Sequence, residues 1–474
     1  MAAAPVDSPA TKPARTRKGR RVLGKLAGVA VIVLAAGWCF YGRDEAPPDD
    51  ADMQVKIPEV PDAENGMTLI RKLPRLGRGF FPYAHAHRTG LKDMDNIFDG
   101  ITRNDTLIAG YLATIKFPLE QMDGALNAPQ FDAGRETPEH FPPIDDKFGE
   151  MDALTLRARL REHQGNFSGA LDDLLRMRRL AVRYSEGHLA LFQLHGAFGL
   201  NNMTNRVGAT LLNDPALPES EVERLAAAWS TEIPWANIYR ESMMLEYQYQ
   251  SAFLAGLKSG QYWEFASLAW DYPNSEGGLE NSAKEFLDDW LRWTYEPNTT
   301  RRLMAEFYRS EMKAMNAPLA VTAKRDPAIM QQTRMSGPWW WDLMPNGGGR
   351  WLLEDVRFKS QYVAMTAFYE EASDRLLQAG WAVRRYFNDQ HELPPTLNAL
   401  VPQYLPAVPA DPFDGQPLRY NRARGLIYSI GDALRDQQGS EYVGKPYYDV
   451  DYENPFYDGR QPTLELKFAS KNGG

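Results

Sequence analysis

Two histidines in the N-terminal third of the sequence have a spacing that metal chemistry can use. His85 and His87 are two residues apart. On an extended backbone both side chains would point to the same face, where two imidazoles can share one metal ion. The sequence shows no third ligand for them. We therefore treat His85 and His87 as a candidate metal pair, and the alternative is that they are ordinary loop or surface histidines.

Adjacent acidic residues are the other side chains with chemical potential. The pairs include Asp172-Asp173, Asp288-Asp289 and Glu370-Glu371. A glycoside hydrolase needs two carboxylates that face each other across a cleft, and a single sequence does not reveal such a pairing. Adjacent acids on a helix usually belong to its solvated side. We expect these pairs to form solvated faces.

Motifs of common nucleophilic enzymes are absent from the sequence. It contains no G-x-S-x-G, and its only cysteine, Cys39, lies in an apolar segment near the N-terminus. His391-Glu392 is not a zinc-protease motif, because Pro395 stands where the second histidine belongs. A single cysteine also excludes an internal disulfide and a site of several thiolates. We identify no catalytic residue and lean towards a protein that is not an enzyme.

The apolar segment at residues 22–41 predicts a transmembrane helix, with Lys25 as its only charge. A helix of this length spans about 30 Å, the thickness of the hydrocarbon core of a bilayer. Six basic residues lie between Lys12 and Arg21, and acids follow the segment from Asp44 onward. The positive-inside rule therefore places residues 1–21 in the cytoplasm as a basic tail and the rest of the chain outside the inner membrane, in the periplasm.

Other targeting signals fit the same segment less well. A cleaved signal peptide remains an alternative, with a small-residue site near Gly37, although the apolar run has full spanning length. Twin-arginine export, from Arg20-Arg21, is a second alternative. Lipid attachment at Cys39 is disfavoured because Trp38 occupies a position that lipoprotein signals fill with a small residue.

Charge is distributed unevenly along the chain. Residues 1–25 carry seven Lys or Arg and one acid, whereas the remainder carries 46 basic and 61 acidic residues, a net charge of −15. An acidic body argues against binding to nucleic acid. The hydrophobic and aromatic contents of 43% and 12% are those of a folded globular chain.

The body between the anchor and the C-terminus is predicted to be mostly helical. Residues 42–61 are acidic and proline-rich, which predicts an extended tether, and residues 62–350 form the helical body. Apolar periodicity predicts helices at 153–163, 169–184, 188–212, 219–229, 235–258, 282–293 and 299–315. Asn298 is a plausible N-cap. Residues 347–349 are three glycines that should break the chain before a long helix over about 351–388.

One pair of these helices resembles a tetratricopeptide unit. The small residues Ala158, Gly165, Ala170 and Ala181 fall near positions where paired helices cross closely. No second copy follows at the repeat spacing, and stacked repeats need about three units to bury a core. We therefore predict irregular helical hairpins rather than a repeat array.

The C-terminal region predicts a small mixed element at residues 351–440. Pro394-Pro395 ends the long helix, and Thr396 can cap a short helix through Leu400. Residues 418–420 and 426–430 read as an antiparallel hairpin turned at Gly425. Asp411-Pro412 and Asp414-Gly415 are expected to turn the backbone rather than to catalyse. Residues 441–474 form a Tyr- and Gly-rich tail that we expect to wrap the surface.

The motifs in residues 381–431 resemble a known family. A predicted helix is followed by three motifs, P-x-x-L-x-x-L-V-P-x-Y-L, D-P-F-D-G-x-P-L-x-Y and Y-S-I-G. This order resembles the soluble end of the major pseudopilins of type II secretion. The same block looks like the C-terminal end of large membrane-anchored bacterial envelope proteins of uncharacterised role, which also have helical bodies. The pseudopilin helix is itself a membrane segment, whereas the helix here is internal and polar. Assembly into a fibre is therefore not implied.

The pseudopilin resemblance also suggests a calcium site. Pseudopilins bind calcium in the loop after Y-S-x-G, which corresponds here to residues 431–440. Asp432 and Asp436 supply hard oxygen atoms that could bind calcium. Arg435 lies between them, and a solvated loop is the alternative.

Together these observations predict a single-pass inner-membrane protein with a large exported helical body. We expect a non-enzymatic envelope scaffold that binds another protein, with no cofactor other than possible calcium and no nucleic acid partner. The alternatives are a hydrolase of envelope glycan or peptide, and an accessory protein of a secretion system.

Overall fold

A computed structural model describes residues 44–73, 103–114, 119–134, 148–258, 294–322, 345–432, 434–439 and 461–468. Over these residues the protein is mostly α-helical, as the sequence predicts. The predicted membrane segment at residues 22–41 lies outside the described residues. Among the helices in the described part of the chain, none has the length and apolar character to cross a membrane.

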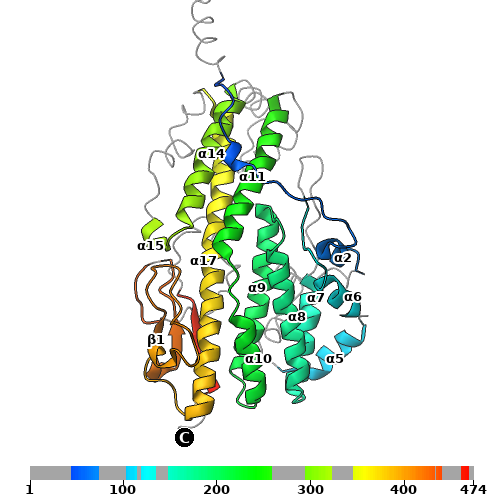
Figure 1. Ribbon diagram of the computed structural model, residues 1–474, viewed down its shortest axis with the longest axis vertical. Helices are drawn as coiled ribbons and strands as arrows, with labels where there is room; N and C mark the ends of the chain where they lie inside the picture. Colours follow the sequence, from blue (N-terminus) through cyan, green and yellow to red (C-terminus); the bar gives the residue numbers. More distant parts are fainter. Residues whose placement is uncertain are drawn as a thin grey trace, which may run out of the picture.

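The described helices build an elongated bundle around one very long helix (Figure 1). The bundle consists of α7 (Phe148–His163), α8 (Phe167–Ser185), α9 (Leu191–Leu212), α10 (Glu219–Trp229), α11 (Trp235–Lys258), α14 (Pro297–Ala314) and α17 (Gly347–Gln390). Helix α17 packs against α9, α10, α11 and α14. Its buried apolar residues join those of the other helices in a single core, so α17 is the axis on which the body is assembled.

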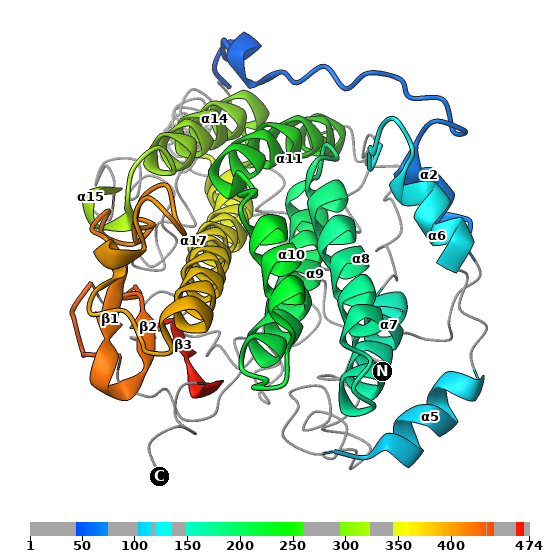
Figure 2. The same cartoon turned by 60° about the horizontal axis from the view of Figure 1, so that its bottom comes forward.

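Shorter helices lie along one edge of the bundle (Figure 2). Helices α2 (Gly66–Arg71) and α6 (Leu119–Leu126) pack on each other, and α5 (Asp105–Thr114) packs on α7 through Ile108 and Leu156. The remaining short elements are α15 (Leu319–Thr322) and the 3-10 turns η1 (Ala51–Met53), η3 (Leu397–Leu400) and η4 (Arg422–Arg424).

Helices α7 and α8 form the hairpin that the sequence predicts. The connecting turn places Gly165 at φ +74°, in the left-handed region that glycine adopts without a steric penalty. Ala158, Ala170 and Ala181 are all buried, and the two helices pack against each other. Small buried side chains in a helical hairpin are the feature that the tetratricopeptide-like spacing predicts.

The start of α14 differs from the prediction. Glu296 is the N-cap residue and Pro297 is the first helical residue, so the prediction of Asn298 as the N-cap is wrong. Proline fits the first helical position because the N–H that it lacks would have no partner within the helix there. The proline therefore marks this boundary better than the polar residue that follows it.

The three glycines at residues 347–349 begin α17 rather than break the chain, so that prediction is also wrong. A Cβ atom on Gly349 would lie 1.9 Å from Thr300 Oγ1. Asn346, the N-cap residue at φ 59°, uses its Oδ1 to accept hydrogen bonds from the Glu296 N–H at 3.0 Å and from Thr300 Oγ1 at 2.8 Å. Glycine at this point lets the first turn of α17 lie directly against α14.

The C-terminal element is a three-stranded antiparallel sheet beside α17. Strands β1 (Arg419–Asn421) and β2 (Leu426–Tyr428) form the predicted hairpin, with Gly425 at φ +58°. The third strand, β3 (Thr463–Glu465), comes from the predicted tail and pairs with β2. Leu464 of β3 packs so closely on α17 that a Cβ at Gly380 would lie 2.5 Å from its Cδ2 atom.

Candidate functional site

A cluster of buried polar side chains lies where α8, α9 and α17 meet, and we call it the central cluster. Its members are Arg178, Asn201, Asn205, Glu370 and Asp374. The two asparagines are four residues apart on α9, and the two acids are four residues apart on α17. Side chains at this spacing share one face of a helix. The two helices therefore each present a pair of polar groups to the same point in the core.

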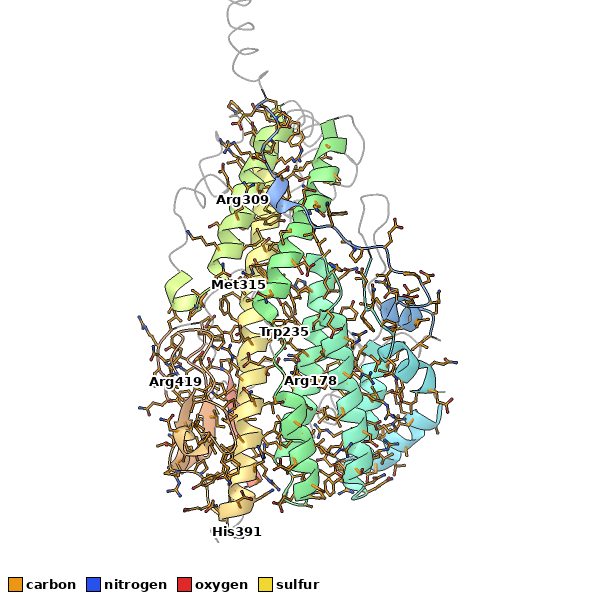
Figure 3. The ribbon with its side chains drawn as sticks, in the orientation of Figure 1. Arg178, Trp235, Arg309, Met315, His391 and Arg419 are labelled. Atoms are coloured by element: carbon orange, nitrogen blue, oxygen red, sulfur yellow. The ribbon has the colours of Figure 1, made fainter. Side chains whose placement is uncertain are left out.

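Asp374 is the acceptor at the centre of this cluster. Its Oδ1 accepts hydrogen bonds from Asn205 Nδ2 at 2.8 Å, Asn201 Nδ2 at 3.1 Å and Arg178 Nη1 at 3.2 Å. Its Oδ2 accepts from Trp235 Nε1 at 3.3 Å. One carboxylate thus joins α8, α9, α11 and α17. Figure 3 labels Arg178 and Trp235, which approach it from α8 and α11.

Arg178 extends the cluster towards α10. It donates from Nη1 to Asn201 Oδ1 at 2.7 Å and from Nη2 to the Thr231 carbonyl at 3.2 Å. Its guanidinium lies 5.2 Å from the ring centroid of Trp229, a distance at which a cation is attracted to the ring face. Trp229 Nε1 in turn donates to Asn205 Oδ1 at 3.1 Å. The buried cation is therefore held by a carboxylate, two oxygen acceptors and an aromatic ring.

Glu370 is the titratable member of the cluster. Its Oε2 accepts a hydrogen bond from Asn201 Nδ2 at 2.8 Å. Burial raises the pKa of Glu370 to about 8, and the negative charge of Asp374 adds to this rise, whereas the Asn201 hydrogen bond opposes it. Glu370 is therefore mostly protonated at neutral pH and can donate a proton. Glu370 is only 2% exposed, so in the folded protein its proton can pass only to neighbouring buried groups.

Asp173 is a second buried carboxylate with polar partners on a neighbouring helix. This fully buried carboxylate pairs with Arg157 at 2.5 Å and Arg161 at 2.8 Å, both from α7, and with Arg176 at 3.5 Å. The expectation that adjacent acids form solvated faces is therefore wrong at Asp173 and at Glu370. The reason is that each has polar partners on a neighbouring helix, which a pattern within one helix does not contain.

Asp411 organises the C-terminal element. Its Oδ1 accepts from Ser429 Oγ at 2.8 Å and the Phe413 N–H at 3.0 Å, and its Oδ2 accepts from Arg419 Nη1 at 2.8 Å and the Ile430 N–H at 2.9 Å. Burial raises its pKa, and these hydrogen bonds oppose the rise. The expected turning role of Asp411 is confirmed, and the carboxylate also fastens the turn to the end of β2.

The predicted metal ligands stay predictions. Asp432 is buried, and Asp436 accepts from Tyr428 Oη at 3.1 Å and from the Gln438 N–H at 2.7 Å. Across the part of the chain that the structure describes, no three His, Cys, Asp or Glu side chains gather closely enough to hold a metal ion. His85 and His87 lie outside the described residues.

The acidic segment after the predicted anchor is attached to the body. We call residues 44–53 the acidic strap. The carboxylate of Asp44 accepts hydrogen bonds from the backbone N–H groups of Asn298 and Thr299 at 3.1 Å, and so caps the N-terminus of α14 from 254 residues away in sequence. A carboxylate is stabilised there by the helix dipole. Residues 44–53 of the predicted tether, which covers residues 42–61, thus lie on α14 and include the 3-10 turn η1.

Arginines of α14 hold the rest of the strap. Glu45 pairs with Arg302 at 2.6 Å, Asp50 with Arg301 at 2.5 Å and Asp52 with Arg309 at 2.5 Å. Hydrogen bonds from Arg302 and Arg309 lower the pKa values of Glu45 and Asp52. Met53 of the strap is fully buried in the main core, and Tyr247 of α11 donates to Asp50. The sequence analysis missed this contact, because opposite charge in two distant segments does not identify them as partners.

Comparisons of the chain with protein-family models, with curated proteins and with solved structures found no match.

Proposed function

We propose that this protein is a single-pass inner-membrane scaffold whose helical body stands in the periplasm and binds another envelope protein. The observation that carries the proposal is the acidic strap. It begins three residues after the predicted membrane segment, and it joins α14 through a helix cap and three ion pairs. Such an attachment couples an anchor to a body, which a scaffold requires and a freely diffusing enzyme does not.

The polar clusters of the body also favour a scaffold. In the central cluster and around Asp173, charged side chains are buried and directed at one another across helix boundaries. Groups arranged in this way hold helices in register, whereas a hydrolytic site must present its acids to an incoming substrate. The pseudopilin-like C-terminal element belongs to the same proposal, as a small module carried beside α17.

Topology is the direct test of the anchor. A reporter that works only outside the cytoplasm, fused after Gly474, should be active, and the same reporter fused before Lys12 should be inactive. Reversing the six basic residues between Lys12 and Arg21 to glutamate should lower the activity of the Gly474 fusion. Activity only in the fusion before Lys12 would contradict the orientation, and intact-mass evidence of cleavage near Gly37 would contradict the anchor.

The scaffold role is tested by photo-crosslinking in cells. Reactive residues placed at exposed positions such as Leu107 should yield discrete heavier species that contain an envelope protein. Recovery of secretion components would favour the accessory-protein alternative. Species no different from those of a buried-position control would contradict a scaffold.

A hydrolase is the second candidate, and the observation behind it is the pair of neighbouring carboxylates Glu370 and Asp374, both joined to Asn201. Because both side chains are buried, this candidate requires the bundle to open for a substrate. Purified full-length protein would be incubated with peptidoglycan, and released fragments would be measured. Release that Glu370→Gln abolishes, at unchanged folding, would favour the hydrolase. The scaffold proposal expects no release from either form.

A further inference from the structure

Three helix ends meet where the acidic strap begins. We call this region the anchor-side tip, and it consists of the C-terminal end of α11 at Leu254, residues 294–300 and residues 346–349. Tyr295 Oη donates to the Leu254 carbonyl at 3.0 Å, and the Asn346 N–H donates to the Thr294 carbonyl at 2.8 Å. Hydrogen bonds thus join the three ends, whose residues Leu254, Tyr295 and Asn346 are buried. The joined ends lie at the top of the long axis in Figure 1.

The strap runs along the body in a fixed direction. It pairs with Arg309 through Asp52 and with Arg302 through Glu45, and it reaches the first turn of α14 at Asp44. Seven residues of helix separate the two arginines, or about 10 Å along α14. From Asp52 back to Asp44, the strap therefore runs along α14 towards the N-terminus of that helix and reaches the anchor-side tip. Figure 3 shows Arg309 part of the way along α14, above Met315, and His391 at the far end of α17.

The distance to the predicted membrane segment is short. Tyr41 ends that segment and Asp44 is held at the tip, so three residues of chain connect them. Three residues span at most about 11 Å. If residues 22–41 cross the bilayer, the tip must therefore lie within about 11 Å of the membrane surface.

The chemistry of the tip suits that position. The carboxylate of Asp44 is matched by the N-terminus of α14, and Glu45 by Arg302, so these acids are neutralised where they approach lipid headgroups.

We propose that the anchor-side tip is the end of the body that faces the lipid headgroups, and that the strap holds α14 and α17 pointing away from the membrane. The inference rests on the proposed membrane anchor. Helix α17 has 44 residues and is about 66 Å long. The far end of α17 and the sheet that packs on its lower half are thus held tens of ångströms from the bilayer, where a partner in the periplasm can reach them.

Energy transfer to labelled lipid tests this orientation. The full chain with Cys39→Ser would carry one fluorescent donor at Arg350→Cys, next to the tip, or at Gln390→Cys, about 60 Å farther along α17. Each form would be reconstituted into vesicles whose headgroups carry an acceptor. We expect strong transfer from position 350 and little from position 390. Equal transfer from both positions, or stronger transfer from 390, would overturn the proposal.

The role of the strap is tested in the same vesicles. Arg302→Glu with Arg309→Glu opposes two strap acids, and we expect the ratio of transfer between the two positions to fall by roughly half as the body swings on a loose tether. Arg224→Glu with Lys313→Glu makes the same charge change away from the strap and should leave the ratio unchanged. Circular dichroism would establish that both variants are folded. An unchanged ratio in a folded strap variant would overturn the holding role.

Failure of the anchor is distinguishable from failure of the orientation. If residues 22–41 are not a membrane segment, the protein will not float with vesicles in a density gradient, and both proposals fall. If it floats but the two donors transfer equally, the anchor stands and only the orientation is overturned.

Discussion

Asp374 and Asp411 are both buried carboxylates that accept four hydrogen bonds, yet they organise the molecule on different scales. The partners of Asp374 come from side chains 139 to 196 residues away and from three other helices. The partners of Asp411 lie within 19 residues, and two of them are backbone N–H groups. One carboxylate therefore ties distant helices into a body, whereas the other closes a local turn.

A buried carboxylate can stabilise either a local turn or the packing of distant helices. A local acceptor such as Asp411 satisfies backbone groups that would otherwise be unpaired in a tight turn. A remote acceptor such as Asp374 pairs a buried arginine, and the free energy of that arrangement depends on every helix being in place. Loss of Asp374 should affect the whole bundle, and loss of Asp411 should affect one module.

The largest expected effect is that of Asp374→Ala. The substitution leaves the Arg178 guanidinium in the core without its carboxylate and removes an acceptor from Asn205 and Trp235. Breaking a buried pair in this way costs about 3–5 kcal/mol of unfolding free energy. Urea unfolding of the purified full chain, followed by circular dichroism, would measure it.

Two variants control this result. Asp172→Ala removes a half-exposed carboxylate that pairs with Arg224, and it should cost no more than about 1 kcal/mol. Arg178→Met combined with Asp374→Leu removes both charges and should recover much of the stability that the single change loses. If Asp374→Ala costs no more than Asp172→Ala, the central cluster does not brace the bundle.

A second prediction concerns the pH dependence of the central cluster. Glu370 has a pKa of about 8 in the folded protein against an ordinary value of 4.5. Its contribution to stability is therefore complete below pH 4.5 and is lost as the pH rises towards 8, because the unfolded chain releases the proton first. The loss amounts to at most about 1.4 kcal/mol for each pH unit.

Glu370→Gln would isolate this contribution. Glutamine keeps an oxygen that can accept from Asn201 but cannot ionise. We expect the variant to lose less stability than the natural protein between pH 5 and pH 8 in urea unfolding. Glu392→Gln, at an exposed ion pair with Arg422, should keep the natural pH profile. Parallel profiles for the natural protein and Glu370→Gln would show that Glu370 ionises normally in the folded state.

The third prediction is the local counterpart, Asp411→Ala. The backbone N–H groups of Phe413 and Ile430 lose their acceptor, at a cost of about 1–3 kcal/mol. Hydrogen exchange should accelerate in residues 411–430 and remain slow in α8 and α9. Asp411→Asn, which retains one acceptor oxygen, should produce a smaller change. Equal loss of protection in α9 would mean that the C-terminal element and the bundle unfold as one unit.

The same contrast explains which features could be predicted from the sequence. Helices α10 and α11 have the bounds that apolar periodicity predicts, because that signal lies within the helix itself. The turning role of Asp411 could also be predicted, because the turn itself lies within the D-P-F-D-G motif, where the Phe413 N–H donates to the Asp411 carboxylate and the Gly415 N–H donates to the Asp411 carbonyl. The hairpin at Gly425 is local in the same way.

Features that depend on distant residues could not be predicted. The spacing of Glu370 and Asp374 is the spacing of an ordinary solvated face, and only the positions of Asn201, Asn205 and Arg178 make it a core cluster. Strand β3 joins the sheet from 35 residues beyond β2. The position of the acidic strap depends on contacts with α14, which lies about 250 residues away in sequence. In each case the missing information was a tertiary contact.

The smallest expected effect is that of Arg309→Ala in the strap. Its ion pair with Asp52 is exposed, so it can be compared with the buried carboxylates Asp374 and Asp411. Asp52 and Arg309 pair at 2.5 Å, but their side chains are 61% and 35% exposed. Water and salt weaken such a pair, so Arg309→Ala should cost only about 0.2–1 kcal/mol, and less at high ionic strength. Urea unfolding at low and high salt would measure it, with Lys313→Ala on the same helix as the matched control. A loss of stability as large as that of Asp374→Ala, unchanged by salt, would contradict a surface pair. It would mean that the strap unfolds together with the core, in which Met53 of the strap is buried.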